Sequence, residues 1–194
     1  GQYLDGTTDI TRTVAVGTPS DFMKQTFTLV LKGHIALASA KFPEGIGGQH
    51  LDTFARQFLW NNGYDFDHGT GHGVGSYLNV HEGPHGIGKG ANKVPLKEGM
   101  VVSNEPGYYR ENEFGIRIEN LIYVKKIKEV DGKRLLGFDN LTYVPLDNRL
   151  FDIELLTEIE KDWINKYHQE TLEKIGPNVE EPTLEWLKMM VQPI

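Results

Sequence analysis

Apolar residues recur every three or four positions in several parts of the chain, a spacing that predicts amphipathic helices. The first predicted helix covers about 20–40 and starts at Ser20, a residue type favoured at helix N-termini. The second covers about 49–61 and ends at Gly63, and its inward side chains are expected to be Leu51, Phe54, Phe58 and Leu59. Two helices are therefore expected in the first third of the chain.

Helical spacing returns in the last part of the chain, residues 152–194. Thr157 followed by Glu160 fits a capping box, in which each side chain bonds the other residue's backbone. A last amphipathic helix is predicted over 183–191. We therefore divide the chain into a domain at 1–151 and a helical extension at 152–194.

Alternating apolar and polar residues, the pattern of a half-buried strand, occur elsewhere. Residues 2–16 alternate around an Asp5-Gly6 turn signal and are predicted to form a hairpin or a bent strand pair, while 81–97 is mostly loop. Further strands are predicted at three places: 99–106, 114–126 and 138–144. Two helices followed by several strands give an α+β order rather than the βαβ alternation of a parallel sheet.

Glycine fills every second position from Gly69 to Gly75, a stretch that also holds His68 and His72. A helix is disfavoured here, because an interior glycine costs about 1 kcal/mol relative to alanine. A strand would place the two histidines on one face, roughly 13 Å apart at about 3.3 Å per residue. We therefore expect at most one of them to bind a given metal ion.

Composition excludes several classes of function. The 194 residues carry a formal net charge of -7 without a Lys/Arg stripe, which argues against binding nucleic acid or an anionic membrane. There are no cysteines, so disulfides, thiolate zinc sites and a cysteine nucleophile are excluded. No apolar run reaches about 18 residues and no signal segment is visible, which favours a cytoplasmic protein. A metal site must therefore use His, Asp and Glu.

Polar residues at predicted strand positions form one pool of candidates: Asp9, His68, His72, His81, Glu105, Arg117 and Glu119. Three carboxylates and an imidazole suit a hard divalent ion such as Mn²⁺, with Co²⁺ or Zn²⁺ as alternatives. Three carboxylates also suggest two ions with bridging ligands, an arrangement suited to hydrolysis. Structural explanations exist as well: Asp9 could stabilise the nearby turn, Arg117 and Glu119 could form an ion pair, and Glu105 could be a solvated loop residue.

Five motifs follow one another along the chain: Asp5-Gly6-Thr7-Thr8-Asp9-Ile10-Thr11-Arg12-Thr13, His68-Gly69-Thr70-Gly71-His72-Gly73-Val74-Gly75, Asn79-Val80-His81-Glu82-Gly83-Pro84, Asn104-Glu105-Pro106-Gly107-Tyr108-Tyr109 and Phe114-Gly115-Ile116-Arg117-Ile118-Glu119-Asn120. Together they resemble the Xaa-Pro aminopeptidase (aminopeptidase P) family of "pita-bread" metallopeptidases, alongside prolidase and methionine aminopeptidase. The tail, with Leu184-Glu185-Trp186-Leu187 and Gln192-Pro193-Ile194, resembles the long, three-domain form. The implied fold is a partial pita-bread fold, a curved antiparallel-rich sheet with flanking helices, followed by a helical extension.

The resemblance implies a two-ion centre in the intact enzyme, and Mn²⁺ is the expected ion. Asp9 and Glu119 would bridge the ions, and His72 and Glu105 would bind one of them. A fifth ligand, an Asp, lies eleven residues before the Asp9 position in the family, which falls ahead of Gly1. The chain also begins without Met. We therefore expect a piece of a longer protein that holds at most one ion well and is inactive or nearly so alone.

The resemblance also implies roles around the substrate. His68 and His81 would orient the scissile carbonyl and stabilise the oxyanion, and Arg117 would hold ligand carboxylates. The implied reaction is hydrolysis of the bond before a proline in second position, with Glu105 relaying a proton to the proline nitrogen. A homodimer through the C-terminal helices is expected. The alternatives are a prolidase, which cleaves only dipeptides, and a non-catalytic module of the same fold that binds proteins.

Overall fold

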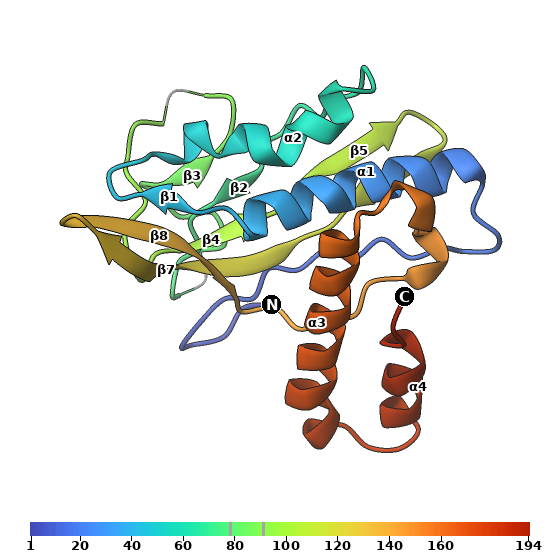
Figure 1. The fold of residues 1–194 in the computed structure, drawn as a ribbon. Coiled ribbons are helices and arrows are strands. Elements are labelled where there is room, and N and C mark those ends of the chain that lie inside the picture. Colours follow the sequence, from blue (N-terminus) through green and yellow to red (C-terminus); the bar gives the residue numbers. More distant parts are fainter. Residues whose placement is uncertain (78, 91) are drawn as a thin grey trace.

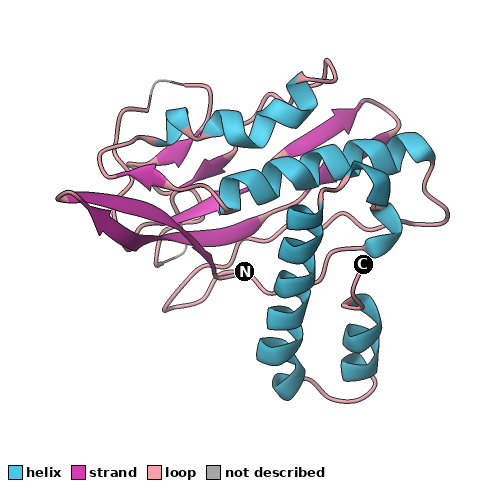
Figure 2. Ribbon diagram, viewed as in Figure 1, coloured by secondary structure: helices cyan, strands magenta, loops and turns pink. Residues whose placement is uncertain are grey.

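The computed structural model describes residues 1–77, 79–90 and 92–194. Two helices, α1 (Asp21–Ala38) and α2 (Asp52–Trp60), lie on one face of an antiparallel sheet. Two more, α3 (Glu158–Ile175) and α4 (Thr183–Met190), lie side by side below α1 in the view of Figure 1. Figure 2 shows the strands gathered in one layer, with loops connecting them at its edges. The architecture is therefore α+β, as the order of elements predicts.

The main sheet has four antiparallel strands in the order β1-β8-β7-β4. Their bounds are β1 Phe42–Pro43, β4 Val101–Asn104, β7 Asn120–Val130 and β8 Lys133–Asn140. Two smaller antiparallel pairs adjoin it: β2 Gly71–His72 with β3 Gly86–Ile87, and β5 Gly107–Arg110 with β6 Phe114–Arg117. A bridge between Gly73 and Val102 places the β2 pair beside β4. Short 3₁₀ turns complete the described elements: Gly48–His50, Asn148–Leu150, Ile153–Leu155 and Gly176–Asn178.

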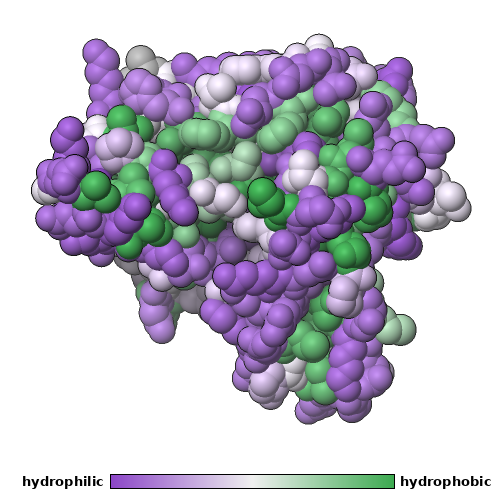
Figure 3. Space-filling view, in the orientation of Figure 1, coloured by the Kyte–Doolittle hydropathy of each residue, from purple (hydrophilic) through white to green (hydrophobic). Residues whose placement is uncertain are grey.

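Two apolar clusters hold these layers together. One lies between α1, α2 and the main sheet and includes Leu37, Ala55 and Ile122. The other joins α1 to α3 and includes Phe27 and Ile164. Because burying a Leu, Ile or Phe side chain contributes about 2 kcal/mol, these clusters account for most of the packing between helices and sheet. On the face in Figure 3, hydrophobic surface gathers along the upper helices and between α3 and α4, with smaller spots over the β7–β8 hairpin.

The predicted helix caps are confirmed, although α2 begins at Asp52 rather than near residue 49, where a 3₁₀ turn lies. Ser20 caps α1, its hydroxyl accepting a hydrogen bond from the Met23 N–H at 3.3 Å. The capping box of α3 is present in both directions between Thr157 and Glu160. Gly63 has a φ of +75°, the left-handed conformation that glycine adopts without strain after a helix. Cap chemistry is local, which is why the sequence alone predicts it well.

One expected core position on α2 is wrong. Phe54 is 39% exposed, and Arg56 is fully buried instead. The guanidinium of Arg56 binds the carboxylates of Asp52 and Asp65 at 2.7 and 2.8 Å and donates to the carbonyl oxygen of His68 at 2.8 Å. A buried charge of this kind is tolerated because it is paired and fully hydrogen-bonded. Arg56 thereby attaches the start of the glycine-histidine stretch to α2.

The predicted strands are correct in part. Residues 2–16 form a turn, with the Tyr3 N–H donating to Gly6 O at 2.9 Å, but among the described residues they pair only through isolated bridges, Gln2 with Thr7 and Thr11 with Glu119. The glycine-histidine stretch is a strand only at β2. The predicted strand 114–126 is divided into β6 and β7, because Glu119 pairs with Thr11 between them. The last predicted strand lies earlier, at β8, and β5 was not predicted.

Within the part of the chain that the structure describes, no helix is both long enough and apolar enough to cross a membrane.

Candidate metal centre

Four of the predicted ligand residues converge at the end of the main sheet. Ligand atoms of Asp9, His72 and Glu119 all lie within 4.8 Å of one another. Nε2 of His72 is 3.3 Å from Oδ2 of Asp9 and 3.2 Å from Oε1 of Glu105. Neighbouring ligands of an octahedral ion with bonds near 2.1 Å lie roughly 3 Å apart, so these spacings suit a shared divalent ion.

Sheet register explains why two glutamates 14 positions apart belong to one site. In the antiparallel pairing of β4 and β7, Asn104 lies opposite Asn120. Continuing that register by one residue places Glu105 opposite Glu119. The Glu119 N–H then donates to Thr11 O at 3.1 Å, which brings the segment carrying Asp9 alongside. The side-chain hydroxyl of Thr11 also donates a hydrogen bond to the Glu119 carboxylate.

The glycines beside His72 allow close backbone approach. A Cβ on Gly71 would lie 1.9 Å from Ser103 O, and one on Gly73 would lie 2.1 Å from Glu82 O. Neither position has room for a side chain, because real Cβ atoms do not approach that closely. Ser103 on β4 completes the link: its hydroxyl accepts from the His72 N–H at 2.9 Å and donates to Glu105 at 3.0 Å. Backbone crowding, not helix formation, therefore explains the alternating glycines at these two positions.

The imidazole of His72 is oriented for metal binding. Its Nδ1 lies 2.9 Å from the carbonyl oxygen of Gly73, a contact that places the proton on Nδ1. When an ion is bound, Nε2 would present its lone pair to it between Asp9 and Glu105; without an ion, Nε2 carries a proton that hydrogen-bonds to Glu105. Hydrogen bonding of the non-ligating nitrogen to a carbonyl is the usual way in which proteins fix a metal-binding histidine.

The charges of the site also fit a cation. Burial, with the like charges of Glu105 and Asp9 nearby, raises the pKa of Glu119. Burial alone would lower the pKa of His72, but hydrogen bonding to Glu105 and the two carboxylate charges raise it. Burial alone would likewise raise the pKa of Glu105, and the hydrogen bonds from His72 and Ser103 lower it. Three carboxylates crowded around one imidazole are the donor set that a hard divalent ion neutralises.

The predicted substrate residues lie around this centre in two groups. The ring of His81 lies 4.3 Å from that of His72, next to the ligands. His68 points elsewhere, with its Nε2 2.8 Å from the hydroxyl of Tyr109. The same hydroxyl accepts from Nε of Arg117 at 2.8 Å, and Nη1 of Arg117 lies 3.9 Å from Oε2 of Glu105. Tyr109 thus connects a predicted substrate histidine to a predicted metal ligand.

Three site residues were missed as functional groups by sequence reasoning: Thr11, Ser103 and Tyr109. Each lies inside or beside a motif singled out by its charged residues, but a hydroxyl leaves no periodic signal. Only the pairing of β5 with β6, in which Gly107 lies opposite Arg117, brings Tyr109 close to the guanidinium. The sequence feature that could have pointed to Tyr109 is its position two residues after Glu105-Pro106-Gly107.

These features define a class, an α+β protein with a carboxylate-rich centre for divalent metal ions. Comparison with protein families identifies it further. The model of metallopeptidase family M24 matches residues 1–126, and the C-terminal region of that family matches residues 134–194. The chain belongs to metallopeptidase family M24.

Curated relatives are similar over the whole chain. A probable Xaa-Pro aminopeptidase P of Laccaria bicolor is 52% identical over all of this chain and 31% of its own length. Aminopeptidase P2 of Arabidopsis thaliana is also 52% identical, over all of this chain and 28% of its own. The chain therefore spans about a third of the length of the curated relatives it matches.

Solved structures confirm the predicted fold class, α+β with a partial pita-bread arrangement. The X-prolyl aminopeptidase of Caenorhabditis elegans, described as a cytosolic enzyme with a di-nuclear active site, matches with a TM-score of 0.93 and 45% identity, over all of this chain and 32% of that one. The prolidase of Pyrococcus furiosus matches with a TM-score of 0.57 and 34% identity, over 70% of this chain and 36% of that one.

Proposed function

We propose that this chain supplies the metal centre of an Xaa-Pro aminopeptidase, which removes the N-terminal residue from peptides with proline second. The observation that carries the proposal is the full set of four ligand residues, converging in a chain that resembles Xaa-Pro aminopeptidases from end to end. A non-catalytic module of this fold has no need for such a donor set. The intact set therefore favours an enzyme over a protein-binding module.

Asp9, His72, Glu105 and Glu119 would hold the metal, with Asp9 and Glu119 bridging where two ions are bound. Divalent ions in such a centre polarise the scissile carbonyl and make water nucleophilic at neutral pH. We propose Mn²⁺ as the resident ion, because oxygen donors dominate the set. The three carboxylates more than neutralise the charge of one divalent ion, but with two ions bound the centre keeps a net positive charge. One ion should therefore bind more tightly than a second.

Glu105 is the residue best placed to move a proton. Its Oε1 is fixed by Ser103 and His72, and its Oε2 faces Arg117. We assign to it the proton taken from the attacking water and returned to the departing proline nitrogen. A carboxylate that is held from both sides returns to one position after each transfer, which suits this role.

The histidines and Tyr109 would bind the substrate. His81, beside His72, would donate a hydrogen bond to the carbonyl oxygen as negative charge develops on it. His68, held through Tyr109 to Arg117, would orient the peptide before the reaction. His81 lies beside His72, which contacts Oε1 of Glu105, and His68 is linked through Tyr109 and Arg117 to Oε2, so the scissile bond would lie between the two histidines.

A prolidase is the second candidate, because solved prolidases share this fold over most of the domain. The TM-score of the Pyrococcus furiosus prolidase is well below that of the Caenorhabditis elegans X-prolyl aminopeptidase. The X-prolyl aminopeptidase also matches over the C-terminal helices. Assay of the full-length protein with Ala-Pro and with Ala-Pro-Ala separates the two. Release of alanine from the tripeptide supports the proposal, and cleavage of the dipeptide alone would show a prolidase.

We propose three further properties of the protein. The domain boundary lies near residue 151, between the end of β8 at Asn140 and the start of α3 at Glu158. The protein acts in the cytosol, as its Caenorhabditis elegans relative is described to do. It forms a homodimer, for which exposed Trp186 and Met189 on α4 offer apolar surface. Light scattering of the full-length protein tests the last of these directly.

A further inference from the structure

A buried tyrosine on α3, Tyr167, connects this helix to the metal-binding segments. The hydroxyl of Tyr167, which is 3% exposed, accepts a hydrogen bond from Nη2 of Arg12 at 2.6 Å. It also lies 2.8 Å from the carbonyl oxygen of Val144, to which it can donate, and accepts from the Val144 N–H at 3.2 Å. Tyr167 therefore contacts both the N-terminal segment and the segment that leads from β8 into the C-terminal region.

Arg12 carries this contact to the ligands. Its Nη1 donates to the carbonyl oxygens of Thr11 and Glu119 at 2.9 and 2.8 Å. Its Nη2 donates to Oδ1 of Asn120 at 2.7 Å. The carbonyls of two segments that carry metal ligands, one with Asp9 and one with Glu119, are thus held by one planar guanidinium. A rigid fork of this kind fixes the relative position of its acceptors, which a flexible ammonium cannot do.

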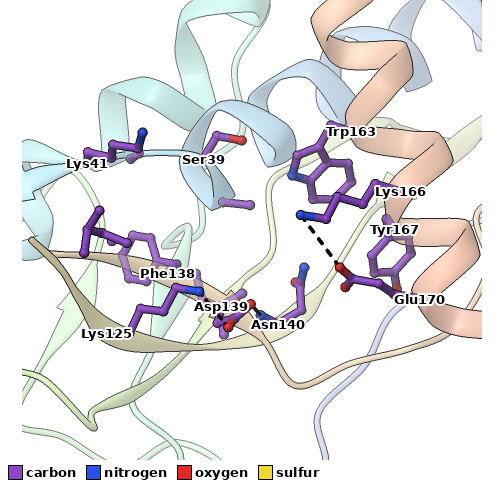
Figure 4. Close-up of a pocket in the computed structure, with 15 residues that line it drawn as sticks. Ser39, Lys41, Lys125, Phe138, Asp139, Asn140, Trp163, Lys166, Tyr167 and Glu170 are labelled. Atoms are coloured by element: carbon purple, nitrogen blue, oxygen red, sulfur yellow. Dashed lines mark hydrogen bonds and ion pairs between the residues drawn. The ribbon is translucent and has the colours of Figure 1, made fainter. Parts of the chain in front are cut away.

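A second contact runs from α3 to the other glutamate. Trp163 stacks on Tyr167 with ring centroids 5.4 Å apart and planes 6° from parallel. Its edge meets the ring of His34 on α1 at 6.0 Å. The His34 carbonyl accepts from the buried side-chain amide of Asn104 at 3.0 Å, and Asn104 precedes Glu105. Figure 4 shows Trp163 and Tyr167 on α3, at the side of a cavity whose other walls are the end of α1 and strands β7 and β8.

We propose that Tyr167 and Arg12 are positioning residues of the metal centre, so that α3 sets the geometry of the ligands although it contributes none. Tyr167 orients the guanidinium, and the guanidinium holds the main chain of Thr11 and Glu119 in register. The inference rests on the proposed metal centre. Its consequence is a loss of metal affinity when one hydroxyl group on α3 is removed.

The test is Mn²⁺ binding by the full-length protein, with free Mn²⁺ counted by electron paramagnetic resonance well below the unfolding temperature. Partners that orient metal ligands typically contribute about 10–100-fold to affinity, and Tyr167 acts one residue further out. We expect Tyr167→Phe to weaken Mn²⁺ binding about 3–10-fold and Arg12→Lys to weaken it about 10-fold or more. Tyr143→Phe is the matched control, because its hydroxyl contacts only Asn140 O and Lys174 among the described residues.

A double variant separates positioning from general loss of stability. If Tyr167 acts through Arg12, Arg12→Lys combined with Tyr167→Phe weakens Mn²⁺ binding little more than Arg12→Lys alone. The comparison of Arg12→Lys with Arg12→Met tests the part of Arg12 separately, since positioning by the planar guanidinium predicts comparable losses in both, and a loss in Arg12→Met alone would overturn it. If folded Tyr167→Phe binds Mn²⁺ with the wild-type affinity, or if Tyr143→Phe loses as much affinity, the inference is overturned while the metal centre stands. Absence of Mn²⁺ binding by the unaltered protein overturns the metal centre and this inference with it.

Discussion

Nε2 of His72 lies 3.2 Å from Oε1 of Glu105, and this contact joins β2 to the end of β4. The two residues are 33 positions apart in sequence, and Ser103 touches both of them. Their separation is that of adjacent ligands around one ion. The centre is thus built where two sheets meet, and its geometry depends on strand pairing rather than on any one motif.

Removing the imidazole should abolish tight metal binding. We expect His72→Ala to lower Mn²⁺ affinity by about 100-fold or more, since a lost ligand costs more than the 10–100-fold typical of a supporting residue. Isothermal titration calorimetry measures the change. His50→Ala is the matched control, because it removes an exposed imidazole on the short turn before α2. Unchanged affinity in His72→Ala would show that the ion binds elsewhere.

The Tyr109 hydroxyl should matter for turnover but not for metal binding. Tyr109→Phe breaks the link between His68 and Arg117, and we expect kcat/KM on Ala-Pro-Ala to fall about 10–100-fold, the range of a lost positioning contact. Mn²⁺ affinity should stay within about twofold, because Tyr109 reaches the ligand Glu105 only through the 3.9 Å contact of Arg117 and so supports the ligand weakly. Tyr108→Phe is the control, since Tyr108 packs in the apolar cluster beside Phe22. Equal losses in both variants would point to packing instead.

The close approach at Gly71 predicts a severe effect of the smallest substitution. Gly71→Ala places a Cβ 1.9 Å from Ser103 O, so β2 must move away from β4. We expect a loss of about 3 kcal/mol or more in the free energy of unfolding, at the upper end of overpacking effects, together with loss of Mn²⁺ binding. Gly90→Ala is the control, because a Cβ there meets nothing within 4 Å. Urea denaturation with and without Mn²⁺ measures both, and a neutral Gly71→Ala would contradict the model of a crowded backbone.

Acid should destabilise the fold through His168. Its Nε2 accepts from the Leu146 N–H at 3.1 Å, and burial lowers its pKa from 6.5 to about 4. The unfolded chain binds this proton first, so stability is full above pH 6.5 and falls as pH drops toward 4. The slope from one such group reaches about 1.4 kcal/mol per pH unit, for a total of roughly 3 kcal/mol.

The measurement is the free energy of unfolding from pH 7 to pH 4.5, compared between the unaltered protein and His168→Gln. Glutamine keeps a hydrogen-bond acceptor but does not titrate, so the variant should lose less stability over this range. His50→Gln, at an exposed position, should follow the unaltered protein. Parallel pH profiles for the unaltered protein and His168→Gln would show that His168 is not the group responsible.

Local patterns predict the helices well. Ser20, Gly63 and the pair Thr157 and Glu160 carry their information within four residues, and the structure confirms each. Strands were harder, because β2 and β3 have only two residues each and exist through their pairing partners. Phe54 and Arg56 show the same limit: an apolar residue was assigned to the core, while a charged one is buried there by acidic partners that periodicity does not reveal.

The residues of the candidate site were predicted from motifs, but their geometry could not be predicted from the sequence. Glu105 and Glu119 follow and precede paired residues of β4 and β7, Asn104 and Asn120, and neither motif contains that register. The contact of Arg12 with Tyr167 spans 155 positions and depends on where α3 packs. The sequence shows Tyr109 within a motif but does not show its contacts with His68 and Arg117, because these two partners come from different parts of the chain. Long-range pairing is thus what the structure adds to the motifs.

The most direct measurement is product analysis by mass spectrometry for the full-length protein, stripped of metal and then supplied with Mn²⁺. We predict that alanine is released from Ala-Pro-Ala but not from Ala-Ala-Ala. Release should stop without metal and in His72→Ala, and continue in His50→Ala. Cleavage that persists in the metal-free protein or in His72→Ala, or no cleavage of Ala-Pro-Ala after Mn²⁺ is supplied, would contradict the account.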